Sequence, residues 1–309
     1  MSTIGLMLGG GGAKGSYQLG VIKALIEEGL YKDVSCVSGT SIGAINAFLL
    51  ASIKTFDEIL SIWKLLNNKN IFKSFRRDYQ GFFDLNALRD TIAQQIDLDY
   101  FHTYPKDIFV TATKMPNSDI FNQVNLLKVT REVFHLNYYD DPIDATMASA
   151  AIPYVFGTKK IGENYYVDGG LVDQNPYEPL LNMGCDLIFS VPLGKKVKGW
   201  FDYKSRNFID IDFLIPNHFF VSTIGDLAES VNFSYVFKHK NFWLGYFYAR
   251  ALIQKLFTNK TLFYDEFGHL ATNAKPSYKR YNLTFKEILL VKQALRVFLK
   301  EDDDTRAQI

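Results

Sequence analysis

The sequence predicts an α/β fold built on a mostly parallel sheet, and two units near its start carry that prediction. In each unit a short apolar run of strand type, at residues 3–8 and 34–38, enters a glycine-rich turn. Apolar residues at helical spacing follow each turn. Strands and helices that alternate in this way are typical of parallel sheets covered by helices. We therefore expect two neighbouring strands whose ends meet at one edge of the sheet.

The first turn contains four successive glycines, Gly9 to Gly12. No side chain shields the N–H groups of such a loop, so it can bind an anion. A dinucleotide is one candidate, because Gly10-x-Gly12-x-x-Gly15 has the Rossmann spacing, but the next strand lacks the expected acidic residue at its end. The Walker pattern is absent, since Lys14 precedes Gly15. The other candidate anion is the oxyanion of an acyl-transfer intermediate.

The second turn, Gly39-Thr40-Ser41-Ile42-Gly43, places a serine between two glycines where a strand runs into a helix. A serine in such a turn has strained backbone geometry, and its hydroxyl projects above the sheet. The N-terminus of the following helix favours negative charge developing nearby. Similar turns also occur for packing or phosphate binding, so this turn alone leaves the role of Ser41 open.

A nucleophilic serine needs a proton acceptor. The five histidines lie among aromatic, apolar or basic residues without a glycine turn, which favours structural roles: His102, His135, His218, His239 and His269. Asp168 instead ends a strand-like run and enters Gly169-Gly170, and catalytic residues collect at such strand ends in α/β sheets. Asp173 is a competing carboxylate that is more easily explained as a turn or capping residue. A serine, acid and histidine order with His218 or His269 in last place also stays open.

Further segments extend the alternation of strands and helices. Helical patterns cover residues 56–66 and 85–96, and another helix is expected to begin at Pro142. A hairpin is expected to join residues 108–113 to 120–124 through a turn at 116–119. After Asp168 we expect one helix at 179–183 and one strand at 186–191, with the core closing near Leu193.

From residue 199 the sequence changes character. Aromatic residues crowd at 213–220 and 241–248, and Lys238, Lys240 and Arg250 flank the second cluster. One interpretation is a surface that meets lipid, where Trp, Tyr and basic side chains favour the headgroup region. The other is a helical cap or a dimer face. The residues leave both interpretations open.

The end of the chain predicts one more helix. Thr284-x-x-Glu287 has the pattern of a capping box, and the helix is expected to run to about Lys300. The acidic run at 301–304 is expected to be a solvated tail.

Composition favours a single enzyme over a nucleic-acid-binding protein. The chain has 309 residues, of which 48% are hydrophobic, and a formal net charge of +1. Cys36 and Cys185 lie in apolar runs, so we expect buried thiols rather than a disulfide. The N-terminus has no basic region of the signal-peptide type and no long uncharged apolar stretch follows, so we expect a cytoplasmic protein without a spanning helix.

Four motifs in one order resemble those of the bacterial-type patatin-like phospholipases. They are the glycine loop from Gly10 to Gly15, the Gly-x-Ser-x-Gly turn around Ser41, an Ala-Ser-x-Ala-x-Pro segment at residues 148–153, and Asp168-Gly169-Gly170. Lys14 stands where many relatives carry arginine, which keeps the positive charge. The resemblance covers roughly the first two hundred residues, and four weak motifs in order are together specific.

The resemblance implies a patatin-like three-layer sandwich, with a catalytic domain at 1–198 and a helical, aromatic-rich extension at 199–309. It implies Ser41 as nucleophile, Asp168 as general base and Gly10, Gly11 and Gly12 as oxyanion hole. Lys14, Gly15, Gly39, Gly43, Gly169 and Gly170 would support these motifs.

The implied activity is hydrolysis of fatty-acyl esters, of phospholipase A or lysophospholipase type, without a cofactor or metal. The implied partners are a phospholipid or lysophospholipid substrate and transient contact with a membrane surface, with no nucleic acid; a homo-oligomer stays open. Two alternatives also stay open. They are a Ser-His-Asp esterase of α/β-hydrolase type and a nucleotide-binding module without enzymatic activity.

Overall fold

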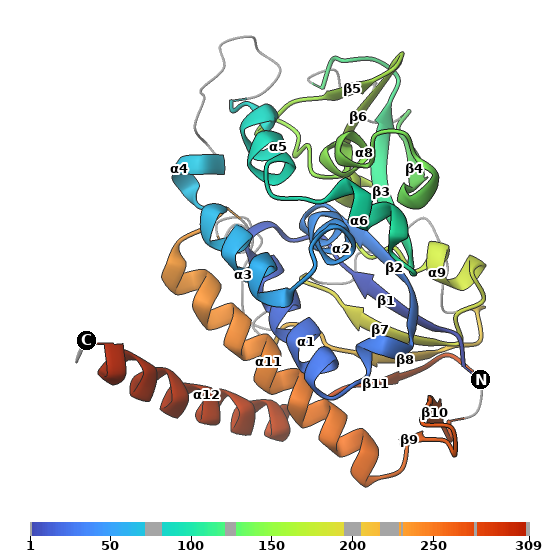
Figure 1. The fold of residues 1–309 in the computed structure, drawn as a ribbon, viewed down its shortest axis with the longest axis vertical. Coiled ribbons are helices and arrows are strands. Elements are labelled where there is room, and N and C mark those ends of the chain that lie inside the picture. Colours follow the sequence, from blue (N-terminus) through green and yellow to red (C-terminus); the bar gives the residue numbers. More distant parts are fainter. Residues whose placement is uncertain are drawn as a thin grey trace.

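A nine-stranded mixed sheet forms the centre of the protein (Figure 1). The computed structural model describes residues 2–71, 82–120, 128–194, 205–216, 229, 231–274 and 277–306. Its strands follow the order β11-β8-β7-β1-β2-β3-β6-β5, and β4 pairs with β3. The strands are β1 (Ile4–Leu8), β2 (Val34–Thr40), β3 (Asp107–Met115), β4 (Thr130–His135), β5 (Lys159–Ile161), β6 (Asn164–Asp168), β7 (Leu187–Val191), β8 (Ile209–Asp212) and β11 (Lys279–Tyr281). The sheet is parallel from β11 to β3, while β4, β5 and β6 form antiparallel pairs, so the predicted α/β class is confirmed.

Helices cover both faces of this sheet. The described helices are α1 (Gly15–Glu27), α2 (Ile42–Ser52), α3 (Phe56–Leu65), α4 (Asn68–Ile71), α5 (Leu85–Ala93), α6 (Leu98–Thr103), α8 (Pro142–Ser149), α9 (Glu178–Asn182), α11 (Tyr235–Thr258) and α12 (Phe285–Arg306). Leu6 and Leu8 of β1 join the core that contains the apolar residues of α1 and α2, whereas Met7 packs on the opposite face with Leu180 of α9. This alternation along one strand places a hydrophobic layer on each side of the sheet.

The first two strand-turn-helix units form as predicted. β1 and β2 are parallel neighbours, and Leu8 pairs with Gly39 at their carboxyl ends. The glycine loop and the serine turn therefore meet at one edge of the sheet. α1 is followed by Gly29, whose φ of 72° is the left-handed conformation that a glycine adopts at a helix C-terminus.

Three sequence-based expectations differ from the structure or lie partly outside the described residues. The hairpin was expected to pair residues 108–113 with residues 120–124. In the structure β3 pairs antiparallel with β4 (Thr130–His135), while positions 121–124 lie outside the described residues. The core does not close near Leu193, because β8 and β11 continue the sheet beyond it. The acidic run at 301–304 continues α12, which extends to Arg306 instead of ending near Lys300.

The C-terminal region contacts the rest of the protein mainly through α11, which lies along α1 (Figure 1). The second predicted aromatic cluster lies on α11, and its Trp243 ring packs 4.6 Å from that of Phe298 on α12. Part of the first cluster, residues 217–220, lies outside the described residues. A small hairpin of β9 (Leu262–Tyr264) and β10 (Leu270–Thr272) follows α11. In the part of the chain that the structure describes, no helix combines the length and apolar character needed to cross a membrane.

Candidate active site

Ser41 occupies a strained turn between β2 and α2. Its φ and ψ are 57° and −123°, outside the regions that residues other than glycine usually adopt. The flanking glycines are required by close packing: a Cβ on Gly43 would lie 2.1 Å from the Leu8 carbonyl oxygen, and one on Gly39 would lie 2.4 Å from that of Gly43. The turn thus needs glycine on both sides of the serine.

The side chain of Asp168, at the end of β6, faces Ser41. The Ser41 hydroxyl donates a hydrogen bond of 2.5 Å to Asp168 Oδ2, and the Gly170 N–H donates one of 2.7 Å to Oδ1. Gly169 allows this approach, because a Cβ there would lie 2.0 Å from the Thr111 carbonyl oxygen. Both carboxylate oxygens are therefore held by a donor, and one donor is the serine hydroxyl.

Burial controls the charge of Asp168. Removal from water raises the pKa of this carboxyl to about 6, although the hydrogen bonds from Ser41 and the Gly170 N–H act in the opposite direction. A carboxylate with a pKa in this range accepts a proton more readily than an ordinary aspartate, whose pKa is near 3.9. A serine hydroxyl and a carboxylate in this arrangement can exchange a proton directly.

The glycine loop passes beside Ser41. A Cβ on Gly10 would lie 3.4 Å from the Ser41 Cβ. The Gly10 N–H donates to the Gln174 carbonyl at 2.9 Å, and Gln174 Nε2 donates back to the Gly10 carbonyl at 3.2 Å. Gly12 has a φ of 57° and begins a 3-10 turn, Gly12–Lys14, whose first N–H groups have no acceptor within the turn. The N–H groups of this loop therefore differ in whether they are available to a bound anion, since the Gly10 N–H already donates to the Gln174 carbonyl.

The other motif residues of this loop are also packed closely. Lys14 is buried in the same 3-10 turn. A Cβ on Gly15 would lie 2.4 Å from Ile42 Cγ1, so this glycine lets the starts of α1 and α2 approach each other. The approach brings the N-termini of both helices to the serine.

Ser149, at the end of α8, is a site residue that the sequence indicates only as one member of a motif. Its hydroxyl oxygen accepts a hydrogen bond of 2.9 Å from the Ser41 N–H, and the hydroxyl donates one of 2.6 Å to the Thr111 carbonyl. The hydroxyl thus ties the strained turn to β3. Its place in the Ala-Ser-x-Ala-x-Pro segment was the available sequence indication.

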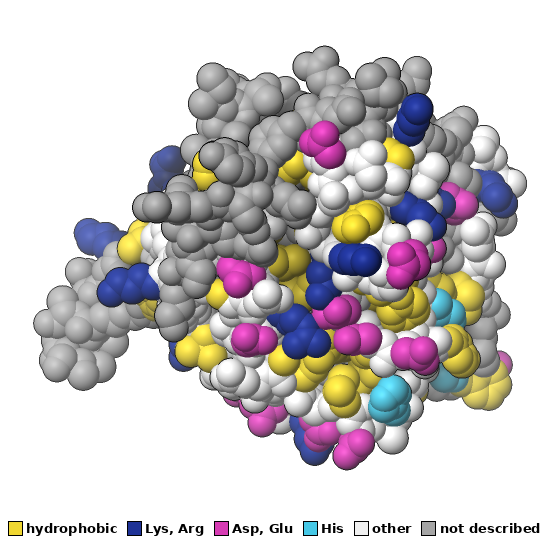
Figure 2. All heavy atoms as spheres, turned by 90° about the horizontal axis from the view of Figure 1, so that it is seen from above, with side chains coloured by type: hydrophobic (Ala, Val, Ile, Leu, Met, Phe, Trp, Pro, Cys, Tyr) yellow, Lys and Arg dark blue, Asp and Glu magenta, His cyan; other side chains and the backbone are white. Residues whose placement is uncertain are grey.

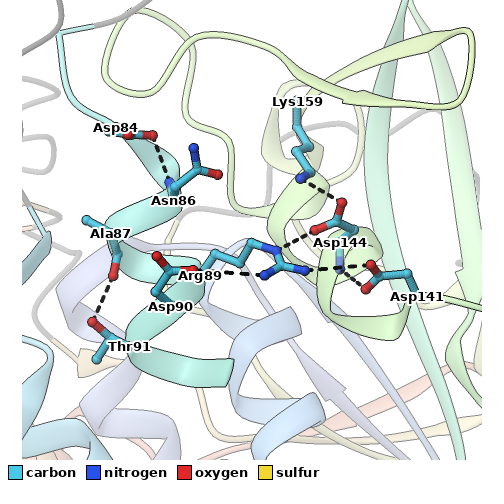
Figure 3. Close-up of polar contacts among 9 residues, drawn as sticks. All are labelled: Asp84, Asn86, Ala87, Arg89, Asp90, Thr91, Asp141, Asp144 and Lys159. Atoms are coloured by element: carbon cyan, nitrogen blue, oxygen red, sulfur yellow. Dashed lines mark hydrogen bonds and ion pairs between the residues drawn. The ribbon is translucent and has the colours of Figure 1, made fainter. Parts of the chain in front are cut away.

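An ion cluster attaches α5 to α8 (Figure 3). Arg89 Nε of α5 donates to Asp144 Oδ1 of α8 at 2.7 Å, and Lys159 Nζ lies 2.7 Å from Asp144 Oδ2. Asp141 caps the N-terminus of α8 by accepting from the Asp144 N–H. These contacts fix the helix that carries Ser149.

A small apolar pocket with a volume of about 30 Å³, partly open to solvent, adjoins the serine. Gly12 and Ser41 lie in its wall. The remaining wall is hydrophobic and comes from α2, α5, the end of α3, α4, the α8–β5 loop and the segment before α11: Ile42, Ile45, Leu66, Ile71, Leu88, Ala150, Ile152, Phe156, Val231 and Phe233. Such a wall suits a hydrocarbon chain and offers few partners to a phosphate or a nucleotide base.

Asp173, the competing carboxylate, has a different partner. Its side chain accepts a hydrogen bond of 3.0 Å from Arg131 Nη1 of β4, and Arg131 also pairs with Glu178. Burial raises the pKa of Asp173 to about 6, while the hydrogen bond and charge of Arg131 lower it. Its carbonyl accepts a hydrogen bond from the Thr40 hydroxyl, so Asp173 lies near the serine turn without reaching Ser41.

The four described histidines contact other groups. His135 bonds Asp107, and His239 accepts from the Trp243 indole N–H. His269 lies 3.7 Å from Asp33, and the His102 ring packs against that of Phe101. His218 lies outside the described residues. Among the described residues, the proton acceptor found at Ser41 is Asp168.

The fold and the site define an α/β protein with a buried serine–aspartate pair at the ends of β2 and β6. A sequence model described as "Patatin-like phospholipase" matches residues 6–181. The chain belongs to the patatin-like phospholipase family, as its four motifs indicated.

Relatives with known names agree with this family. The chain is 27% identical over 219 residues to "Lysophospholipase NTE1" of Kluyveromyces lactis, covering 62% of this chain and 13% of the relative. It is 30% identical over 198 residues to "Lysophospholipase nte1" of Aspergillus terreus, covering 62% and 12%. The chain thus spans about an eighth of the length of these relatives. "Human GIVD cytosolic phospholipase A2" is a solved structure with 12% identity and a TM-score of 0.41, covering 62% of this chain and 43% of that one.

Proposed function

We propose that this protein is a serine acyl hydrolase that cleaves fatty-acyl esters of phospholipids or lysophospholipids. The observation that carries the proposal is the 2.5 Å hydrogen bond between Ser41 and a buried Asp168 beside an apolar pocket. The names of the two lysophospholipase relatives support a lipid ester as substrate. We also place the enzyme in the cytoplasm, in transient contact with the membranes that supply its substrate.

In the first step Ser41 Oγ attacks the ester carbonyl carbon while Asp168 Oδ2 accepts the hydroxyl proton. The carbonyl oxygen takes up negative charge, and N–H groups of the glycine loop stabilise it. Of the three glycines predicted for this role, we assign the donation to Gly11 and Gly12, because the Gly10 N–H is bonded to Gln174. Asp168 then returns the proton to the leaving alcohol oxygen, and an acyl-serine remains.

In the second step water attacks the acyl-serine. Asp168 accepts a proton from the water, the bond from the carbonyl carbon to Ser41 Oγ breaks, and Asp168 gives the proton back to that oxygen. The products are a fatty acid and the free serine. No group beyond the Ser–Asp pair and the glycine loop is needed to balance the protons.

The test combines covalent labelling with hydrolysis of a lipid. Wild type incubated with a fluorophosphonate should gain one adduct on the peptide that contains Ser41, as detected by mass spectrometry. Wild type should also release fatty acid from lysophosphatidylcholine micelles, while Ser41→Ala and Asp168→Asn should lose at least about a thousandfold in kcat. Labelling at another residue, or hydrolysis by Ser41→Ala, would contradict the proposal.

The same assay separates the two alternatives. A Ser-His-Asp esterase requires loss of activity in His218→Ala or His269→Ala and retention in Asp168→Asn. A nucleotide-binding module requires tight binding of NAD or ATP and no hydrolysis of any acyl ester.

A further inference from the structure

Helix α12 is fixed to the protein along one side only. Ile288, Val291 and Leu295 are buried on that side. The helix runs antiparallel to α11, since Glu287 near its start pairs with Lys255 at 2.8 Å and Asp302 near its end lies 3.5 Å from His239. The opposite side of α12 is exposed.

The exposed side of α12 combines apolar and basic residues. Its four exposed apolar side chains, each at least 50% accessible, are Phe285, Leu289, Leu290 and Val297. Its four basic residues are Lys286, Lys292, Arg296 and Lys300. At 3.6 residues per turn these eight residues and Gln293 occupy one continuous sector of the helix. We call this sector the outer face of α12.

From Phe285 to Lys300 the outer face contains no acidic position, whereas in the last turn of α12 positions 303 and 304, both aspartates, fall within the same sector. Glu287 and Asp302 are directed toward α11, and Glu301 is exposed at the edge of the sector near its C-terminal end. The basic groups are close enough to influence one another: burial lowers the pKa of Lys292, and the positive charges of Lys240 and Arg296 lower it further. The face seen in Figure 2 differs, because acidic and basic side chains are interspersed there.

We propose that the outer face of α12 docks on an anionic lipid surface. Apolar side chains between basic ones are the pattern of a helix that lies in a membrane interface, where the former enter the acyl boundary and the latter attract anionic headgroups. A nucleic acid would match the charge but not the exposed leucines and phenylalanine. The charge and the apolar side chains together fit a lipid surface.

The C-terminal end of α12 lies near the start of α11, and the segment just before α11 lines the apolar pocket. The C-terminal end of α12 lies beside His239, in the second turn of α11. Two exposed side chains, Tyr235 and Val236, begin α11 and follow Phe233, which lines the pocket. Docking would thus bring the bilayer toward the rim of the pocket. The relation between docking and the pocket rests on the proposed function, whereas docking itself does not.

The test measures co-sedimentation of the full chain with vesicles. We expect binding to mixed phosphatidylcholine–phosphatidylglycerol vesicles, little binding to phosphatidylcholine alone, and weakening as salt is added. The triple variant K292Q/R296Q/K300Q should bind the mixed vesicles roughly a hundredfold more weakly, since each basic residue near a membrane surface contributes about 1 kcal/mol. The double variant L289S/V297S should also lose binding.

The matched control removes three exposed lysines elsewhere, as K160Q/K260Q/K279Q. It should bind like wild type, and every variant should keep its melting temperature and its hydrolysis of a short, water-soluble ester. Unchanged binding of the α12 variants would overturn the proposal, as would equal loss in the control. A wild-type dimer that K292Q/R296Q/K300Q turns into a monomer would also overturn it, because a second copy would then cover the face.

Failure of the docking proposal can be distinguished from failure of the proposed function. Ser41→Ala should bind the vesicles like wild type although it cannot turn over lipid. If wild type binds vesicles but hydrolyses no acyl ester, the docking surface stands and the proposed function is wrong.

Discussion

The raised pKa of Asp168 predicts how activity depends on pH. A general base works only when ionised, and with a pKa of about 6 the ionised fraction falls roughly tenfold for each pH unit below that value. We expect kcat/KM for a soluble chromogenic ester to rise with pH through about 6 and to level off above 7. A profile that is flat between about pH 5 and 7 would exclude Asp168 as the titrating base.

The same carboxyl should reduce stability when it ionises. Its pKa is raised in the folded state, so wild type loses stability as the pH rises from the unfolded value of 3.8 to about 6. This loss is about 3 kcal/mol for a shift of about two units. Asp168→Asn cannot ionise and still offers an oxygen to the Gly170 N–H. We expect urea unfolding to show Asp168→Asn more stable than wild type at pH 8, with the difference vanishing near pH 4.

Ser149 should affect the reaction through the position of Ser41. Ser149→Ala leaves the Ser41 N–H and the Thr111 carbonyl without their partner, and each unsatisfied buried group costs about 1–3 kcal/mol. We expect a lower melting temperature and a fall in kcat of tenfold or more at nearly unchanged KM. Ser52→Ala is the matched control, because it removes another buried hydroxyl that bonds only the Phe48 carbonyl in its own helix. Equal kcat in the two variants would mean that Ser149 is not a positioning residue.

At the scale of elements, Arg131 of β4 supports the glycine loop through the loop that follows Asp168. Arg131 holds Asp173, and the adjacent Gln174 carbonyl accepts from the Gly10 N–H. Arg131→Met leaves two carboxylates, Asp173 and Glu178, without their cation, and because these pairs are only partly buried the cost lies below the roughly 3–5 kcal/mol of a fully buried pair. We expect a lower melting temperature together with a lower kcat.

The control for Arg131 is Arg280 of β11, which pairs with buried Asp212 on β8. Arg280→Met should lower the melting temperature but leave kcat/KM unchanged, because β8 is separated from β1 by β7. The two variants therefore separate a loss of stability from a displaced glycine loop. If Arg131→Met and Arg280→Met lost stability and activity to the same extent, Arg131 would have no specific role in positioning the glycine loop.

Local patterns predicted the strands and turns that carry the site, because an apolar strand followed by glycines determines backbone geometry over a few residues. The partners of these turns are distant in sequence. Nothing near Gly10 indicates that its N–H bonds the Gln174 carbonyl, and nothing near Ser149 indicates the Ser41 N–H. The sequence therefore indicated Ser41 and Asp168 as candidates, which the structure joins by a hydrogen bond, but not the contacts that hold their loops.

The later elements were harder to predict for a similar reason. β8 contains Asp210 and Asp212, both fully buried, which local patterns place at a surface. The structure compensates them with distant groups: the Ser190 and Tyr177 hydroxyls bond Asp210, and Arg280 pairs with Asp212. In α12 the acidic run continues the helix, and Asp302 lies 3.5 Å from His239 of α11. Both elements thus have contacts with residues that are distant in the sequence.

At the scale of the whole molecule, the C-terminal region contributes to both the pocket and the core. Phe233 lines the pocket beside Ser41, and α11 supports α1, whose first turn follows the glycine loop. The division into domains at 1–198 and 199–309 stays a prediction. The packing of α1 on α11 nevertheless indicates that the site depends on residues far beyond its motifs.

Two glycines allow α1 and α11 to approach closely. A Cβ on Gly20 would lie 1.9 Å from the Phe242 carbonyl oxygen, and one on Gly245 would lie 2.1 Å from that of Tyr17. Because each glycine faces backbone atoms of the other helix, the methyl group added in Gly20→Ala can be accommodated only if the two helices move apart. The Tyr17 ring, which packs edge-on against Tyr248 with centroids 6.5 Å apart, would lose part of its contact.

We expect Gly20→Ala to destabilise the fold by roughly 2–3 kcal/mol, as overpacking does, and to lower kcat because α1 begins beside the glycine loop. Gly162→Ala is the control: its φ is 57° and no atom lies within 4 Å of the added Cβ, so it measures only the backbone cost of about 1 kcal/mol. Urea unfolding and ester hydrolysis on the two variants separate the effects. If Gly20→Ala lowers stability no more than Gly162→Ala and leaves kcat unchanged, the contact between α1 and α11 does not position the site.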